Sequence, residues 1–216
     1  MINYNPIDGD VYSKKIKCRP KTCFIMTKLG KTIPKEISNM RRTAEKYLKN
    51  YKFEIIDASS TVTGRDFLSK IFELILSVPL GIALISENLN SITIANIFYE
   101  IGLLQALGKE TLIIKTEKSN IPSDFIRTEY IKYDNKFKEK IDEYLITYFE
   151  QAEHYELLGC ELIKDPITSI DYLKRSYLMT GEKNTKNKIN KIISILFSPE
   201  YFTKEIQKNI KSLITS

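Results

Sequence analysis

The sequence predicts an α/β fold with a parallel sheet, followed by a small all-α helical unit, and three observations lead to this prediction. Five short apolar runs typical of strands alternate with amphipathic helical segments. Strand-like runs stop after residue 150, where only helical periods follow. The 216 residues, of which 43% are hydrophobic, allow one full domain with a sizeable core plus a small appendage.

The predicted strands are short apolar segments bounded by turn residues, at residues 22–27, 53–58, 81–85, 111–115 and 129–133. The predicted helices have apolar residues three and four positions apart, at residues 35–48, 66–76, 94–107 and 137–149. Pro34 marks the start of the first helix, and Gly108 follows the third as a left-handed cap residue. Alternation with short links predicts a doubly wound, five-stranded parallel sheet covered on both faces.

The expected strand order is the flavodoxin-like order 2-1-3-4-5, in which the chain reverses direction between the first and third strands. Ligands of such sheets bind at this reversal, outside the carboxyl ends of the strands. We therefore expect a crevice there, with the turn at residues 27–31 facing the loop at residues 86–96.

The chain is expected to have three parts. Residues 1–20 form an N-terminal extension with two prolines and a basic cluster, and residues 21–150 form the α/β domain. Residues 151–216 form the helical C-terminal domain, with helices predicted at 152–163, 169–180, 184–196 and 203–214. Pro166 and Gly181 bound the second of these helices, so the first two are expected to form an antiparallel hairpin. The residue spacing of this hairpin loosely resembles one tetratricopeptide repeat. The alternative is that the C-terminal helices form a cap on the sheet domain or a dimerisation unit.

Composition excludes several classes of function. No apolar run approaches the roughly 18–20 residues of a spanning helix, and no secretory signal is visible, so we expect a cytoplasmic protein without membrane contact. The net charge is +6, but the lysines are dispersed, which argues against specific nucleic-acid binding. Cys18, Cys23 and Cys160 are expected to be free thiols. His154, the one histidine, excludes a zinc site and, unless it serves itself, a histidine-dependent hydrolase; we expect it to be a polar helix residue.

Glu100 is the most informative residue of the chain. On a helical wheel it lies beside Ile97 and Leu104, so its charge belongs to an otherwise apolar stripe near the start of the helix after the third strand. Gly102 costs the helix about 1 kcal/mol relative to alanine, which a close backbone approach would justify. These features suit a ligand site. The alternative is that Glu100 favours the positive end of the helix dipole and that Gly102 permits tight packing.

Residues 23–115 resemble the superfamily that joins nucleoside 2-deoxyribosyltransferases to TIR-like domains. The resemblance covers about half of the chain and begins with an apolar strand that ends in a Met-Thr-Lys turn. It continues with Asp57 after the second strand and with a Gly-Arg-Asp sequence at 64–66. Its most specific part is Asn-x-x-Tyr-Glu-x-Gly at 96–102, followed by Ala-Leu-Gly-Lys at 106–109.

The resemblance implies site residues. Glu100 would be the catalytic glutamate, acting on the anomeric carbon of a ribose joined to a nitrogen base. The residues implied to contact the sugar or phosphate are Thr27, Lys28 and Gly30, and those implied to line the opposite lip are Ser86, Glu87 and Asn96. Further candidates for substrate binding are Asp57, Arg65 and Tyr99. Arg65 could instead pair with Asp66 or Glu73, and Tyr99, Tyr130 and Tyr133 could either stack on a base or serve packing.

The leading functional expectation is a TIR-like NAD+ glycohydrolase. Nicotinamide leaves NAD+ as a neutral molecule, whereas a neutral nucleobase generally needs a proton from a second acid. Asp57 is the obvious second acid, but it is expected farther from the strand reversal. Lys28 and Lys31 suit a pyrophosphate. NAD+ would be substrate, and no metal or other cofactor is expected.

Two alternatives stay open: a nucleoside or nucleotide 2-deoxyribosyltransferase or hydrolase, and a non-catalytic module that binds a nucleotide signal and a partner protein. The resemblance further implies a bacterial antiviral defence effector that acts as a homo-oligomer. An activating signal molecule or a partner protein would switch it on, and the C-terminal helices are the candidate control element.

Overall fold

The sheet of the computed structural model has five parallel strands in the order β2-β1-β3-β4-β5, which confirms the predicted fold class. The structure describes residues 4, 8–12, 16–30, 32–61, 67–125 and 129–196. The strands are β1 (Thr22–Met26), β2 (Glu54–Asp57), β3 (Leu80–Ile85), β4 (Glu110–Lys115) and β5 (Tyr130–Lys132). Every residue of β1 and β3 is buried, as expected for central parallel strands covered on both faces.

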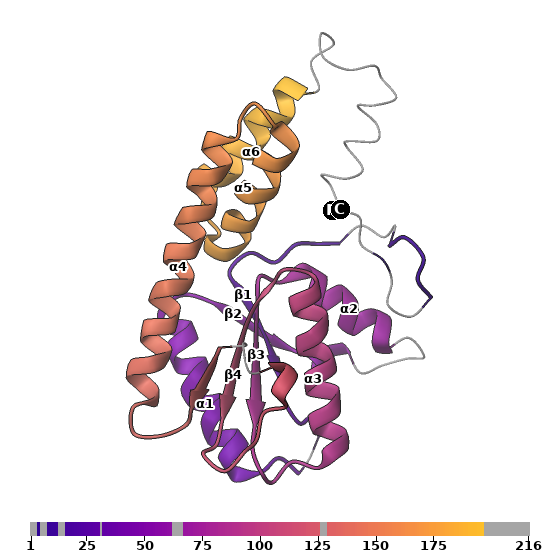
Figure 1. Ribbon diagram of the computed structural model, residues 1–216, viewed down its shortest axis with the longest axis vertical. Coiled ribbons are helices and arrows are strands. Elements are labelled where there is room, and N and C mark those ends of the chain that lie inside the picture. Colours follow the sequence, from indigo (N-terminus) through magenta and orange to yellow (C-terminus); the bar gives the residue numbers. More distant parts are fainter. Residues whose placement is uncertain are drawn as a thin grey trace. The chain divides into compact units, whose positions relative to one another are not determined.

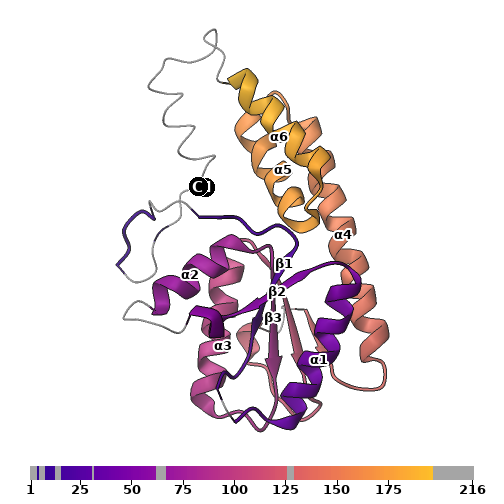
Figure 2. The same cartoon turned by 180° about the vertical axis from the view of Figure 1, so that it is seen from behind.

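Helices cover both faces of this sheet (Figure 1). The helices α2 (Phe67–Ser77) and α3 (Ser91–Ala106) pack against each other on one face, and α3 contacts β3 and β4. The other face carries α1 (Lys35–Asn50) and the first turns of α4 (Phe137–Glu161), as the view from behind shows (Figure 2). The Tyr51 hydroxyl after α1 donates to Asp142 of α4 at 2.7 Å. Short 3₁₀ helices precede α2 (Ala58–Thr61, η1) and β5 (Ser123–Phe125, η2).

Two of the differences between the predicted and the observed helix bounds concern α3 and α4. α3 begins at Ser91, three residues early, because the side chain of Asn90 accepts a hydrogen bond from the Thr93 N–H at 2.8 Å and caps the helix. The predicted loop at 86–96 is therefore a short loop at 86–90 followed by helix. The two helices predicted at 137–149 and 152–163 are one continuous helix, α4.

A glycine does permit a close approach between α3 and the sheet, but it is Gly81 of β3 and not Gly102. A Cβ atom on Gly81 would lie 2.3 Å from Cδ1 of Leu104, whereas a Cβ on Gly102 would meet nothing within 4 Å. Leu104 thus occupies the space that a side chain at position 81 would fill. The alternative that Gly102 permits tight packing was wrong for the described residues, and a close approach of a ligand to Gly102 stays a prediction.

The chain divides into two compact units, Lys21–Thr147 and a second composed of Met1–Pro20 with Tyr148–Ser216. In the second unit, α5 (Pro166–Thr180) and α6 (Lys183–Leu196) pack against each other, and Gly181 ends α5 in the left-handed conformation with φ 73°. Gly159 of α4 lies against Leu173 of α5. The buried core of the helices comprises Ile170, Leu173, Ile189 and Leu196. The three-part domain division stays a prediction.

Some predicted features lie outside the described residues, namely Lys31, the Gly-Arg-Asp sequence at 64–66, where the second helix was predicted to begin, and the helix at 203–214. In the described part of the chain, no helix has the length and apolar character needed to cross a bilayer. The three cysteines are free thiols, as predicted.

Candidate functional site

Glu100 is a partly buried carboxyl group in the middle of α3. It is the tenth of the 16 residues of that helix, so it lies in the third turn. The sequence had predicted a later helix start and therefore placed Glu100 near the beginning of the helix. Burial raises the pKa of Glu100 from 4.5 to about 7. Among the described residues, none donates a hydrogen bond to this carboxylate or forms an ion pair with it. An unpartnered, partly buried acid costs stability, which is typical of functional groups.

The neighbours of α3 show which way Glu100 faces. Ile97 and Leu104 are buried against the sheet. One flank of this apolar stripe faces the β4 side, because the Phe98 ring lies 4.8 Å from the Phe125 ring of η2. On the helical wheel Glu100 lies on the opposite flank, about 160° from Phe98.

A second contact on the β4 flank supports this orientation. The Gln105 side chain donates to Thr111 of β4 at 3.2 Å, and Gln105 shares the flank of Phe98 on the wheel. Glu100 therefore faces α2, the helix that packs on the other side of α3. This is the side on which β1 adjoins β3, where the sheet order reverses.

Asn96 and Tyr99 differ in their relation to Glu100. Asn96 is exposed and lies one turn nearer to the helix start on the flank of Glu100. Since helical side chains lean toward the helix N-terminus, Glu100 leans toward Asn96 and the carboxyl edge of the sheet. Tyr99 is 47% exposed and lies on the side of α3 turned away from the sheet. The structure thus brings Asn96, and not Tyr99, onto the flank of the candidate acid.

Thr27 follows β1 directly at the strand reversal. It is 9% exposed, and its buried hydroxyl has no hydrogen-bond partner among the described residues. Ile25 pairs with Asp57, and the Asp57 side chain accepts a hydrogen bond from Arg41 of α1, so both residues lie on the α1 face of the sheet. Because side chains alternate along a strand, Thr27, two residues after Ile25, continues on this face. A buried hydroxyl without a partner costs free energy unless a ligand or water satisfies it.

The turn after Thr27 leads to an uncapped helix. Lys28 is half-buried, and Gly30 is exposed with φ 103°, a conformation that favours glycine. A Cβ on Gly30 would meet nothing within 4 Å. Pro34 precedes α1, and among the described residues no side-chain cap accepts a hydrogen bond from the first backbone N–H groups of that helix. These N–H groups carry the positive end of the helix dipole and can bind an anion.

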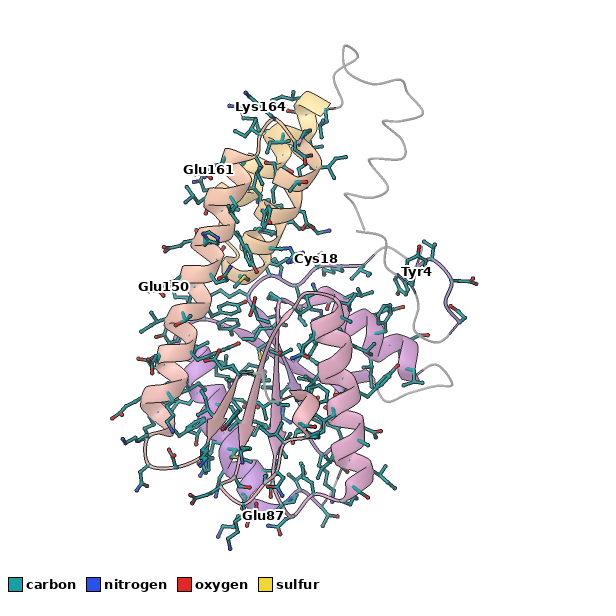
Figure 3. The ribbon with its side chains drawn as sticks, viewed as in Figure 1. Tyr4, Cys18, Glu87, Glu150, Glu161 and Lys164 are labelled. Atoms are coloured by element: carbon teal, nitrogen blue, oxygen red, sulfur yellow. The ribbon has the colours of Figure 1, made fainter. Side chains whose placement is uncertain are left out.

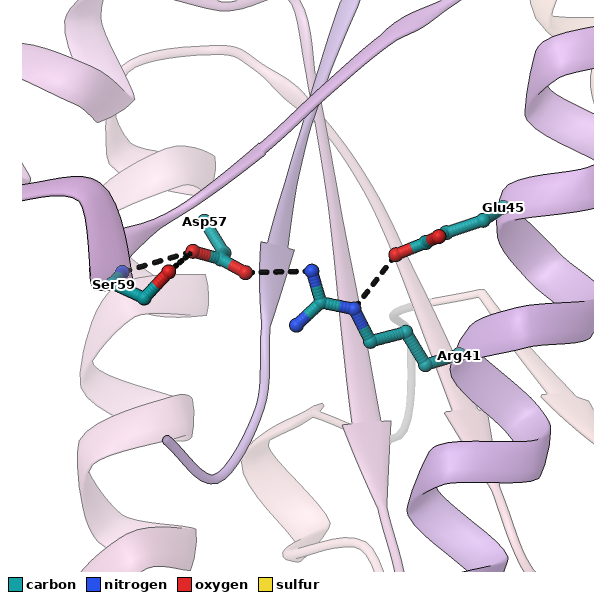
Figure 4. A network of polar contacts seen from close by, with 4 residues as sticks. All are labelled: Arg41, Glu45, Asp57 and Ser59. Carbon is teal, nitrogen blue, oxygen red and sulfur yellow. Dashed lines mark hydrogen bonds and ion pairs between the residues drawn. The ribbon is translucent and has the colours of Figure 1, made fainter. Parts of the chain in front are cut away.

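Asp57 is held in an ion-pair network (Figure 4). Its carboxylate accepts from Arg41 at 2.6 Å and from the Ser59 N–H at 2.9 Å, and the Ser59 hydroxyl also donates to it. Arg41 also contacts Glu45 at 2.7 Å. Burial alone would raise the pKa of Asp57, but the hydrogen bonds from Ser59 and Arg41 outweigh burial and lower it. Asp57 is therefore ionised at neutral pH and is a poor proton donor.

Ser86 and Glu87 form the start of the loop after β3, at the edge toward which the strands point (Figure 3). The buried Ser86 hydroxyl accepts from the Asn88 N–H at 3.1 Å. The exposed Glu87 carboxylate accepts from the hydroxyl groups of Thr116 and Ser119 in the loop after β4. Hydrogen bonds from Thr116 and from its own backbone N–H lower the pKa of Glu87. Glu87 thus joins two loops at the carboxyl edge.

The remaining candidates divide between packing and exposure. Tyr133 bonds Thr43 through its hydroxyl at 3.2 Å and packs its ring on Phe137, so it serves packing. Tyr130 of β5 is 45% exposed. Arg65 lies outside the described residues. In the described ranges, no three His, Cys, Asp or Glu side chains are grouped closely enough to hold a metal ion.

Sequence reasoning missed two charged residues at this edge, Arg41 and Lys115. Arg41 lies on the half-buried side of α1, and its pairing with Asp57 joins residues 16 positions apart. Lys115 ends β4 and is only 8% exposed. The apolar run before Lys115 was the one available signal, because a lysine that continues a buried strand is itself expected to be buried.

No family model matches the chain, and no curated protein sequence is significantly similar to it. Among solved structures, the chain is similar to a 2-deoxyribosyltransferase from the psychrotolerant bacterium Bacillus psychrosaccharolyticus. The two are 11% identical, with a TM-score of 0.43, over 56% of this chain and 90% of the other.

Proposed function

We propose that this protein is an enzyme that cleaves the N-glycosidic bond of NAD+, with Glu100 as the catalytic carboxylate. The observation that carries the proposal is the state of Glu100: it is partly buried, it has no partner among the described residues, and its pKa is about 7. It lies on the flank of α3 that faces the strand reversal. A carboxylate there can face a bound sugar.

The chemistry requires one well-placed negative charge. Cleavage of an N-glycosidic bond builds positive oxocarbenium character on the ribose, and the ionised carboxylate of Glu100 would stabilise it by charge or by covalent capture. Water then completes hydrolysis to ADP-ribose. Partial burial of Glu100 strengthens this interaction because the local dielectric is lower than in water.

The choice of NAD+ rests on the pKa of Glu100, which no second acidic group of the described residues perturbs. Nicotinamide departs as a neutral molecule from a bond that already carries positive charge, so no acid is needed. A neutral nucleobase generally needs a proton, and Asp57, the predicted second acid, is held ionised by Ser59 and Arg41. This supports the glycohydrolase over the 2-deoxyribosyltransferase.

The turn after β1 supports a phosphorylated substrate. The buried Thr27 hydroxyl and the N-terminus of α1 lie at the two ends of the loop that joins β1 to α1. Both can donate hydrogen bonds to a pyrophosphate. Lys28 and Gly30 lie within that turn. Asn96 and Ser86 would line the other side of the crevice.

The test is product analysis by chromatography after incubation with NAD+. Wild type should release nicotinamide, and Glu100→Gln, which keeps the shape and removes the charge, should lose at least about 100-fold of that rate. The matched control is Glu153→Gln, since Glu153 is an exposed glutamate of α4. Equal rates for wild type and Glu100→Gln would refute the assignment. Base exchange between two nucleosides, without NAD+ cleavage, would instead identify a 2-deoxyribosyltransferase.

We further propose that the enzyme acts as a regulated bacterial defence effector in the cytoplasm and that it self-associates. The helical part that follows the α/β unit would receive the activating signal or bind a partner protein. Assays of NAD+ cleavage over a series of protein concentrations test this: specific activity should rise with concentration if assembly activates the enzyme. Constant specific activity together with a constant monomer mass would refute self-association as the control.

A further inference from the structure

Lys115 is a buried cation that the proposed reaction does not use. It is the last residue of β4 and is 8% exposed. Its ammonium group donates to the backbone carbonyl of Ser119 and lies 5.8 Å from the centre of the Tyr130 ring. No carboxylate of the described residues forms an ion pair with it.

An ammonium group in this position is incompletely satisfied. It has three N–H donors, and the one hydrogen-bond acceptor described for it is a neutral carbonyl. Burial of a charge is costly unless an opposite charge and hydrogen bonds compensate it. The Tyr130 ring offers only a weak compensation. A bound anion would supply the missing charge and acceptors.

The face of the sheet on which Lys115 lies is partly exposed at β5, beside its ammonium group. Gly81 of β3 faces α3, and because side chains alternate along a strand, Ile85 faces α3 as well. Lys115 pairs with Ile85 and with Lys132 of β5, so the side chains of both lysines lie on this α3 face of the sheet. In the described residues of the connection from β4 to β5, the short 3₁₀ helix η2 stands where doubly wound folds usually have an α-helix. Tyr130, on this same face, is accordingly 45% exposed.

The charges around this position favour an anion with more than one negative charge. Lys115 and Lys132 are neighbouring cations at paired positions, which is unfavourable unless an anion lies between them. The charge of Lys132 also helps to lower the pKa of Asp134, and the charge of the exposed Lys118 helps to lower the pKa of Glu87. The acidic groups at this loop are Glu87 and the exposed Glu117. Glu87 contacts the hydroxyl groups of Thr116 and Ser119 rather than Lys115.

We propose that Lys115 is the centre of a phosphate-binding site at the carboxyl ends of β4 and β5, with Lys132 as its second cation. Lysine is a common phosphate ligand, and a phosphate monoester carries between one and two negative charges near pH 7. The site goes beyond the proposed reaction, because its binding does not depend on Glu100. Its ligand is either free phosphate or the phosphate group of a nucleotide.

The experiment measures binding to the full chain by calorimetry at fixed ionic strength, with inorganic phosphate, pyrophosphate, AMP and adenosine as probes. Wild type should bind the phosphorylated probes and not adenosine. Binding of AMP together with inorganic phosphate identifies a general phosphate site, and binding of AMP without inorganic phosphate identifies a nucleotide site. Absence of binding by all three phosphorylated probes would overturn the proposal.

Variants locate the site. Lys115→Met keeps an unbranched side chain that is one atom shorter and removes the charge, and it should weaken phosphate binding about 10- to 100-fold. Lys118→Met, at an exposed lysine three residues on, should stay within about threefold of wild type, as expected for a screened surface charge. Unchanged binding by Lys115→Met, or an equal loss in both variants, would overturn the proposal.

Two further measurements separate this site from the proposed reaction and from misfolding. Glu100→Gln should bind phosphate as wild type does, whether or not the chain cleaves NAD+. Without phosphate, Lys115→Met should unfold at the wild-type temperature or above it, because an unpaired buried charge has been removed. Added phosphate should raise the Tm of wild type and not that of Lys115→Met; equal shifts in both would place the anion elsewhere.

Discussion

Replacing Glu100 by glutamine should stabilise the protein at alkaline pH. The carboxyl group has a pKa of about 7 in the folded chain and 4.5 when unperturbed. Between these values the folded state binds more protons than the unfolded state, so the stability of wild type falls as the pH rises through this window. Each pKa unit corresponds to about 1.4 kcal/mol, so at pH 8 ionised Glu100 costs about 3 kcal/mol. Glutamine, which resembles the protonated acid, avoids this cost.

The measurement is thermal unfolding of wild type and Glu100→Gln at pH 4.5 and pH 8. For a chain of this length, about 3 kcal/mol corresponds to a rise in Tm of roughly 5–10 °C, expected at pH 8 and nearly absent at pH 4.5. Glu153→Gln should leave Tm unchanged at both pH values. An equal effect of Glu100→Gln at the two pH values, or none at pH 8, would show that the carboxyl group is not desolvated, and the reasoning about the site would fail.

Three further results are expected. The kcat/KM for NAD+ should rise with pH to a plateau with an apparent pKa near 7, since ionised Glu100 is needed; a fall above pH 7 would indicate a proton donor instead. By denaturant titration, Gly81→Ala should destabilise by about 1–3 kcal/mol through its clash with Leu104, whereas Gly102→Ala should be neutral or stabilising by up to about 1 kcal/mol. Asp57→Asn should destabilise by about 1–3 kcal/mol at pH 7. That loss should shrink as the pH falls below 3.8, because the pKa of Asp57 is lower in the folded chain.

The sheet could be predicted because buried parallel strands leave continuous apolar runs. The segments at 81–85 and 111–115 were each found one residue short of β3 and β4, and the strand order was correct. The start of α3 was missed because its first turn contains Ile92, an apolar residue that is 72% exposed, so the apolar periodicity begins later than the helix. Asn90, an N-cap residue type, was the available signal.

The site could be predicted only where one helix carries the information. The neighbours of Glu100 at three and four positions follow from helical geometry, and they led to a partly buried acid that the structure contains. Contacts between elements could not be read in this way. The bonds from Arg41 to Asp57, the contact of Leu104 with Gly81 and the burial of Lys115 depend on tertiary packing.

The contact between Gly81 and Leu104 also has a consequence for the acid itself. Leu104 lies one helical turn after Glu100, so the depth to which its methyl groups enter the sheet sets the height of the carboxylate above the strands. A methyl group added at position 81 would force Leu104 to change its rotamer or α3 to move outward, and an outward movement would carry the acid with it, although the two residues need not touch. In the proposed reaction the reach of the acid toward a sugar would thus depend on a residue that has no side chain, and a larger residue at 81 would require a smaller one at 104 to restore it.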